Sequence, residues 1–69
     1  MVNNLRKIMD EKNISEGYVA KKLHYTPSAI HHYCTGRTVP NVIIALKIAN
    51  ILKVELKEIW EVVDEDERE

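Results

Sequence analysis

The 69-residue sequence has one cysteine, no phenylalanine, two prolines and two glycines. A single cysteine excludes an intrachain disulfide, which suits a reducing compartment. No apolar stretch approaches the roughly 20 residues that cross a bilayer. The N-terminus begins directly in a mixed polar and apolar pattern, so no secretory signal is expected. These absences predict a small domain in the cytoplasm with no membrane association.

Acidic residues are missing from one long part of the chain. Between residues 17 and 54 there are five basic residues and no acidic one, whereas residues 55–69 contain eight acidic and two basic residues. The formal net charge of −1 therefore combines a basic segment with an acidic C-terminus. Because binding to a polyanion depends on the local field, the basic segment is a candidate for binding nucleic acid. Five positive charges over such a span are also typical of an ordinary solvated surface.

The strongest pattern is the segment SEGYVAKKLHYTPSAIHHYCTGR at residues 15–37, which predicts two short helices around a tight turn. Ser15 can cap the first helix and Thr26 the second. Pro27 suits the first helical position because its missing N–H would have no partner there. Gly36 supplies the left-handed residue that commonly follows a helix. Two short helices, the second with a polar outer face, are typical of a helix-turn-helix that reads DNA.

Apolar spacing predicts three further helices: Asn3 to Lys12, Asn41 (as the N-cap) to Leu52, and Glu55 to Trp60. Asn13 is expected to end the first of them in the left-handed conformation. The fold class is therefore all-α, with five helices. Its expected core consists of Leu5, Ile8, Met9, Val19, Ala20, Leu23, Ile30, Tyr33, Cys34, Ile44, Ala45, Ile48, Ala49, Leu52, Leu56, Ile59 and Trp60.

This pattern resembles the lambda-repressor/Cro-like helix-turn-helix family, also called the Xre family. The resemblance runs without a gap from Leu5 to Trp60 and rests on Leu5-Arg6, Val19-Ala20, Leu23, Ile30, Gly36, Pro40, Leu46-Lys47-Ile48-Ala49, Leu52, Val54, Leu56 and Ile59. It implies a compact five-helix domain, usually a dimer on an inverted-repeat operator in double-stranded DNA. The expected protein is a bacterial or phage transcriptional regulator, acting as a repressor and without enzymatic activity. Residues 1–60 form the predicted domain and 61–69 an acidic tail.

Base contacts are expected from the outer face of the second motif helix, which would lie in the major groove. By resemblance, Pro27, Ser28 and His32 match the main base-contacting positions of the family. Pro27 offers only apolar contact and Ser28 discriminates poorly. His32 is the first choice for reading a base because imidazole both donates and accepts. His31 lies nearer the edge and is a candidate for a phosphate contact.

Phosphate contacts, which set register and affinity but carry no sequence information, are expected around the end of the same helix. Arg37, Thr38 and the backbone amides after Gly36 are the main candidates, and two threonine hydroxyls are further ones. The complete predicted DNA-binding set is Thr26, Pro27, Ser28, His31, His32, Thr35, Arg37 and Thr38.

Two positions depart from the family pattern where DNA would bind. Relatives usually have glutamine at the first residue of the first motif helix, where this chain has Glu16, followed by Gly17. A carboxylate suits a helix N-terminus but is repelled by phosphate. Glu16 is therefore expected either to turn away, toward a protonated histidine or a cytosine amino group, or to weaken DNA binding.

Other departures concern the core and the turns. Many relatives carry an arginine and a glutamate, forming a buried ion pair, at the positions of Met9 and Cys34. Since replacing both partners by apolar groups is often neutral or stabilising, the two residues are expected to form a core contact. His24 and Lys53 stand where glycine usually follows a helix, so slight strain is expected there.

Dimerisation is predicted from apolar side chains beyond what one small core needs. Relatives often dimerise through the loop before the fourth helix and through the fifth helix. The predicted interface is Val39, Val42, Ile43, Ile59, Trp60 and Val62, to which the acidic tail can contribute.

The sequence offers three alternatives to DNA binding. A protein-interaction module, such as an antirepressor or antitoxin-type partner, is favoured by Glu16 and the acidic tail and opposed by the acid-free span. No metal or cofactor is expected. The sequence has no second cysteine to complete a structural zinc site with the histidines, and His31 and His32 point in different directions. A cysteine nucleophile is not expected, since Cys34 lies in the apolar stripe.

Overall fold

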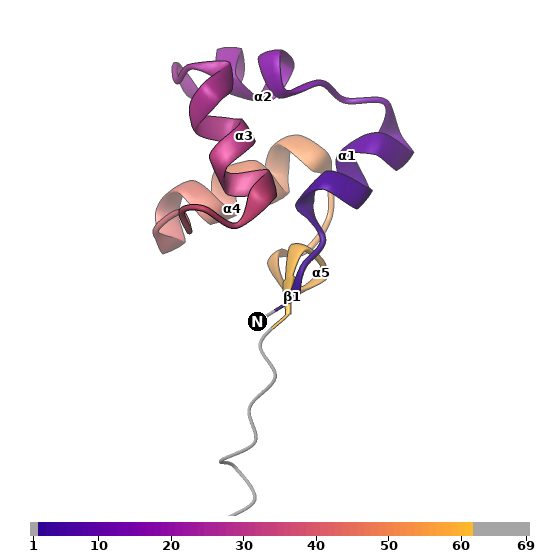
Figure 1. Cartoon of the computed structure of the whole chain (residues 1–69). Helices are drawn as coiled ribbons and strands as arrows, with labels where there is room; N and C mark the ends of the chain where they lie inside the picture. The colour runs from indigo at the N-terminus through magenta and orange to yellow at the C-terminus, as the bar shows by residue number, and fades with distance from the viewer. Residues whose placement is uncertain (1, 62–69) are drawn as a thin grey trace, which may run out of the picture.

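The computed structural model describes residues 2–61. In chain order its elements are β1 (Val2–Asn3), α1 (Leu5–Lys12), α2 (Glu16–Leu23), α3 (Pro27–Thr35), α4 (Val42–Leu52), α5 (Leu56–Ile59) and β2 (Trp60–Glu61). Figure 1 shows α2 at the end of the domain opposite α5 and β1, with α3 running from α2 toward the middle of the domain. The predicted all-α fold with five helices is confirmed.

Three of the helices begin at a residue whose side chain acts as the N-cap, as predicted. The oxygens of Ser15, Thr26 and Asn41 accept hydrogen bonds from backbone amides three residues later, at 3.1, 3.3 and 2.9 Å. Each bond satisfies an amide that has no partner within its own helix. The helix-turn-helix is therefore specified locally: Ser15 starts α2, and Thr26 with Pro27 starts α3.

Four helices end on a left-handed residue. Asn13, His24, Gly36 and Lys53 have φ values of 58°, 61°, 83° and 59°. The left-handed conformation costs a residue with a Cβ about 1 kcal/mol, and asparagine tolerates it best. The expected strain at His24 and Lys53 therefore agrees with their backbone angles.

The core is built from one face of every helix. Its fully buried side chains include Leu5 and Met9 of α1, Ile30 of α3 and Ile48 of α4. Every other predicted core residue is also buried or packs against this cluster. The Cys34 Sγ lies 3.7 Å from the Met9 Sδ, which confirms the predicted apolar contact between α3 and α1.

A two-stranded antiparallel pairing closes the domain and was not predicted. Val2 pairs with Glu61, and Asn3 with Trp60. Asn3 and Trp60 are therefore strand residues and not helix ends, which corrects both predicted helices by one or two residues. The side-chain Nδ2 of Asn3 also donates to the Tyr33 carbonyl at 2.7 Å, so the strand pair lies against α3.

Candidate nucleic-acid interface

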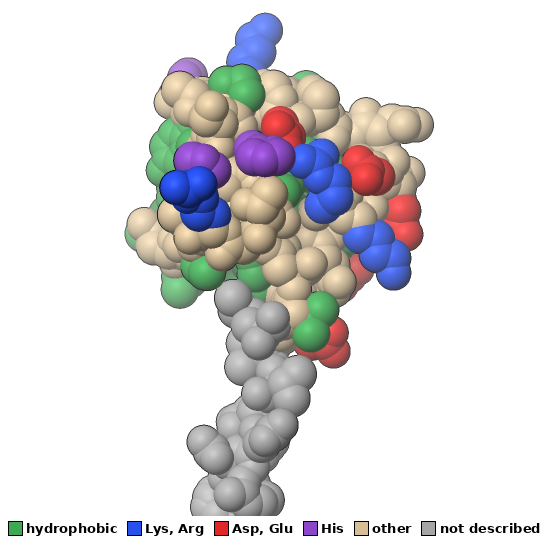
Figure 2. Space-filling view, in the orientation of Figure 1, with side chains coloured by type: hydrophobic (Ala, Val, Ile, Leu, Met, Phe, Trp, Pro, Cys, Tyr) green, Lys and Arg blue, Asp and Glu red, His purple; other side chains and the backbone are tan. Residues whose placement is uncertain are grey.

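The outer face of α3 is polar and accessible. Pro27, Ser28, His31 and Thr35 are exposed and His32 is half-buried, whereas Ile30 on the opposite side is fully buried. The buried residue fixes the rotation of the helix, so the candidate base-reading side chains face outward. Figure 2 shows histidine side chains beside basic and acidic ones on one face of the domain.

A charged cluster joins this face to the two preceding helices. The Glu16 Oε2 accepts a hydrogen bond from His31 Nδ1 at 3.0 Å and a second one from Arg6 Nη2. Only 22% of the Glu16 side chain is exposed. Glu16 therefore turns toward a histidine, which was one of the two alternatives drawn from the sequence. We call Arg6, Glu16 and His31 the carboxylate cluster.

The carboxylate cluster keeps Glu16 ionised. Burial by itself raises the pKa of Glu16, but hydrogen bonds from His31 and Arg6 and the positive charge of Arg6 outweigh it, so the pKa lies below its ordinary value of 4.5. At neutral pH the Glu16 carboxylate beside the face that would meet DNA is therefore charged, and it already has two partners.

This lowered pKa predicts a pH-dependent stability. The folded-state pKa of Glu16 is below the unfolded one, so its stabilising effect is present above the unfolded value and is lost as the pH falls through the folded value. At about pH 7, Glu16→Gln is expected to lower the free energy of unfolding by about 0.5–1 kcal/mol, the range of partly exposed ion pairs. Urea unfolding at about pH 7 and about pH 3 measures the difference, which should shrink in acid.

The matched control for that measurement is Glu11→Gln, which removes an exposed acid of α1 outside the carboxylate cluster. It is expected to change stability by less than about 0.5 kcal/mol at either pH. An effect of Glu16→Gln that is the same in acid as at neutral pH would show that the carboxylate charge does not stabilise the fold.

The predicted phosphate-contacting groups differ in what they can still donate. The Thr26 hydroxyl oxygen accepts from the Ala29 amide, so its proton remains available, whereas the Thr35 hydroxyl donates to the His32 carbonyl at 3.2 Å. The amides of Arg37 and Thr38 donate to that same carbonyl, at 3.0 and 3.3 Å. These two amides are therefore used to end α3, and the exposed Arg37 and Thr38 side chains are the better phosphate candidates.

The Cys34 thiol and the metal-ligating side chains are the remaining candidates for chemistry. Burial raises the pKa of the Cys34 thiol, which favours its neutral, unreactive form. Within residues 2–61 there is no group of three or more side chains suited to hold a metal ion.

An exposed apolar surface lies at the start of α4. Val39, Val42, Ile43 and Leu46 are 58%, 67%, 65% and 47% exposed. We call these four residues the α4 apolar surface. Ile59 and Trp60, which the sequence assigned to the dimer interface, are 0% and 8% exposed and belong to the core, so neither offers a surface to a partner. Val62, the last residue of that prediction, lies outside the described residues.

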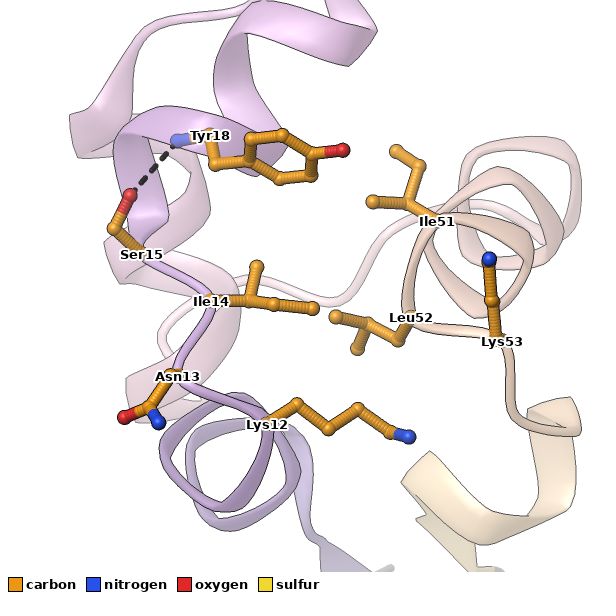
Figure 3. Close-up of a pocket in the computed structure, with 8 residues that line it drawn as sticks. All are labelled: Lys12, Asn13, Ile14, Ser15, Tyr18, Ile51, Leu52 and Lys53. Atoms are coloured by element: carbon orange, nitrogen blue, oxygen red, sulfur yellow. Dashed lines mark hydrogen bonds between the residues drawn. The ribbon is translucent and has the colours of Figure 1, made fainter.

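A shallow hollow of about 640 Å³ lies between the α1–α2 turn and the end of α4 (Figure 3). Ile14, Ile51 and Leu52 form its apolar side, and Lys12 and Lys53 supply amino groups. None of its lining residues belongs to α3. The hollow is therefore separate from the surface expected to read DNA.

Comparison with known proteins gives one family. The helix-turn-helix family model matches residues 5–59, from the first residue of α1 to the last of α5. No curated protein sequence matches the chain. Within the described part of the chain, every helix is too short or too polar to cross a membrane.

Proposed function

The chain belongs to the lambda-repressor/Cro-like family of DNA-binding helix-turn-helix regulators, and on that basis we propose that it is a transcriptional repressor which binds an inverted-repeat operator as a homodimer. It acts on DNA in the cytoplasm. Base contacts come from α3 in the major groove, with His32 as the main reading residue, and Arg37 and Thr38 contact phosphates.

The observation that carries this proposal is the exposed polar face of α3 within an acid-free stretch of sequence. Residues 17–54 contain no acidic residue, and the five exposed or half-buried polar and proline side chains of α3 lie inside that range. Such a face offers groups that hydrogen-bond base edges, and the basic residues of the same stretch of sequence attract the DNA backbone. Glu16, the acid nearest this face, is paired within the carboxylate cluster.

The homodimer is proposed to form through the α4 apolar surface. Four apolar side chains, each about half or more exposed, lie on one helix and the loop before it. A second copy of the same chain covers this surface by twofold symmetry, since such an interface is self-complementary. The two α3 helices of the dimer then lie about 34 Å apart, one turn of DNA.

A second candidate, a protein-interaction module that does not bind DNA, is favoured by Glu16 at the start of α2. Both candidates are separated by selecting duplexes bound from a random library at about 150 mM salt. Enrichment of an inverted repeat with half-sites one turn apart would support the repressor. Enrichment of nothing by the folded protein would support the interaction module.

The roles of His32 and Arg37 predict two different binding defects. His32→Ala is expected to cost about 1–3 kcal/mol on the selected operator and to relax preference at one base pair per half-site. Arg37→Ala is expected to weaken binding to all sequences about equally and to reduce the salt slope by about one. Competition binding over all single-base operator variants measures both. An unchanged sequence preference in His32→Ala would remove His32 as the reading residue.

A further inference from the structure

The carboxylate cluster occupies the place where the DNA backbone would pass. In a helix-turn-helix complex the second helix lies in the major groove and the first crosses the phosphate backbone. Glu16 is the first residue of α2 and is hydrogen-bonded to His31 of α3, so it lies at the junction of the two helices. A carboxylate here repels a phosphate unless a neighbouring cation offsets it.

Arg6 is the cation that meets this condition. Its guanidinium is held by Glu16 through Nη2, and its Nη1 lies 3.9 Å from Asp10 on the same helix. The Arg6 side chain nevertheless remains 46% exposed. Because a guanidinium has five N–H donors in a planar fork, the bond to Glu16 leaves donors for another acceptor.

Being held in place makes Arg6 a better phosphate ligand than a free surface cation. An arginine anchored by a hydrogen bond from the protein has less rotamer freedom to lose when it binds a second group. The exposed edge of its fork fits the oxygens of a phosphate, which arginine binds with two parallel hydrogen bonds. The other basic residue next to it, Lys7, is exposed and makes no ion pair with the described residues.

We propose that Arg6 is a DNA-binding residue that contacts a backbone phosphate beside α2 while its guanidinium remains bound to Glu16. This inference rests on the proposed function, because it requires the domain to dock on DNA through α2 and α3. It places on α1 a phosphate contact that is additional to the DNA contacts proposed for α3 and for the loop after Gly36.

The test is the salt dependence of binding to a mixed-sequence duplex of about 30 base pairs, followed by fluorescence anisotropy. Arg6→Gln is expected to weaken binding by about tenfold at about 150 mM salt and to reduce the slope of log K against log salt by about 0.9, the value for one phosphate contact. Lys7→Gln, which removes the same charge from the same helix, is expected to change the slope by much less. Arg6→Lys is expected to keep most of the slope, since it retains a cation.

The double variant Arg6→Gln with Glu16→Gln distinguishes two roles of Arg6. Arg6 either contacts a phosphate directly or only neutralises the charge of Glu16. If Arg6 contacts phosphate, the double variant stays weak and keeps the reduced slope. If Arg6 only neutralises Glu16, removing both charges restores the affinity and slope of the unmodified protein, and the inference is overturned. Circular dichroism and thermal unfolding confirm that each variant is folded. An unmodified protein that binds no duplex would overturn the proposed function itself, a result distinct from equal binding by Arg6→Gln.

Discussion

Replacing Met9 by arginine is expected to leave most of the protein unfolded. The Met9 side chain is completely buried and contacts Cys34, so the new guanidinium would lie in the core without a carboxylate partner. An unpaired buried charge costs about 3–5 kcal/mol, which is about the whole net stability of a domain of this size. Urea unfolding, or the loss of helical circular dichroism where no folded baseline remains, measures the effect.

The double variant Met9→Arg with Cys34→Glu should regain much of this stability. The two sulfur atoms are 3.7 Å apart, so the introduced charged groups would be placed to form an ion pair between α1 and α3. Met9→Leu, which keeps volume and polarity, is the matched control and is expected to cost less than about 1.5 kcal/mol. A double variant as unstable as Met9→Arg alone would show that the position of Cys34 cannot hold a compensating carboxylate.

The sequence predicted the features of the fold that depend on near neighbours. Ser15, Thr26 and Asn41 cap helices because a short polar side chain reaches an amide three residues away, a relation that spacing alone reveals. The β1–β2 pairing was missed because two-residue strands have no periodicity. They form only when α5 returns the chain to its N-terminus, as the bond from the Asn4 amide to the Ile59 carbonyl at 2.7 Å shows.

The sequence predicted the parts of the candidate site that depend on residues close in the chain. It did not predict the contacts between side chains of different helices. Pro27 and Gly36 define the ends of α3, and its buried Ile30 decides which side chains face outward. The conflict between a carboxylate and DNA suggested either that Glu16 turns away, toward a histidine or a cytosine amino group, or that DNA binding is weaker. The second partner of Glu16, Arg6, is ten residues away on another helix, and only the packing of α1 against the motif brings the two together.

For a related reason, two residues predicted for the dimer interface lie in the core instead. The spacing of apolar residues predicts which side chains are buried. It does not show whether they are buried in the core of their own domain or against a partner. Ile59 and Trp60 are covered by the core, since α5 closes the domain. The α4 apolar surface, made by Val39, Val42, Ile43 and Leu46, is left for a second copy in the proposed dimer.

Ile43→Asp is therefore expected to convert the protein to a monomer and to weaken binding to the full operator by at least about 100-fold. Ile43 is 65% exposed, so the substitution should change the stability of the fold by no more than about 0.5 kcal/mol. In a dimer interface the same aspartate would be buried next to its symmetry mate, which is strongly unfavourable. Sedimentation equilibrium at tens of micromolar measures the oligomeric state.

The loss of operator affinity arises because two linked half-sites bind with an effective concentration that two separate monomers do not have, a difference of about 10²–10⁴. Binding of Ile43→Asp to a duplex with a single half-site should accordingly match that of the monomeric unmodified protein. Asn13→Asp is the matched control, because it adds the same charge to an exposed residue at the end of α1, outside α4. If Asn13→Asp weakens operator binding as much as Ile43→Asp does, the added charge and not the interface is responsible, and a second copy does not bind at the α4 apolar surface.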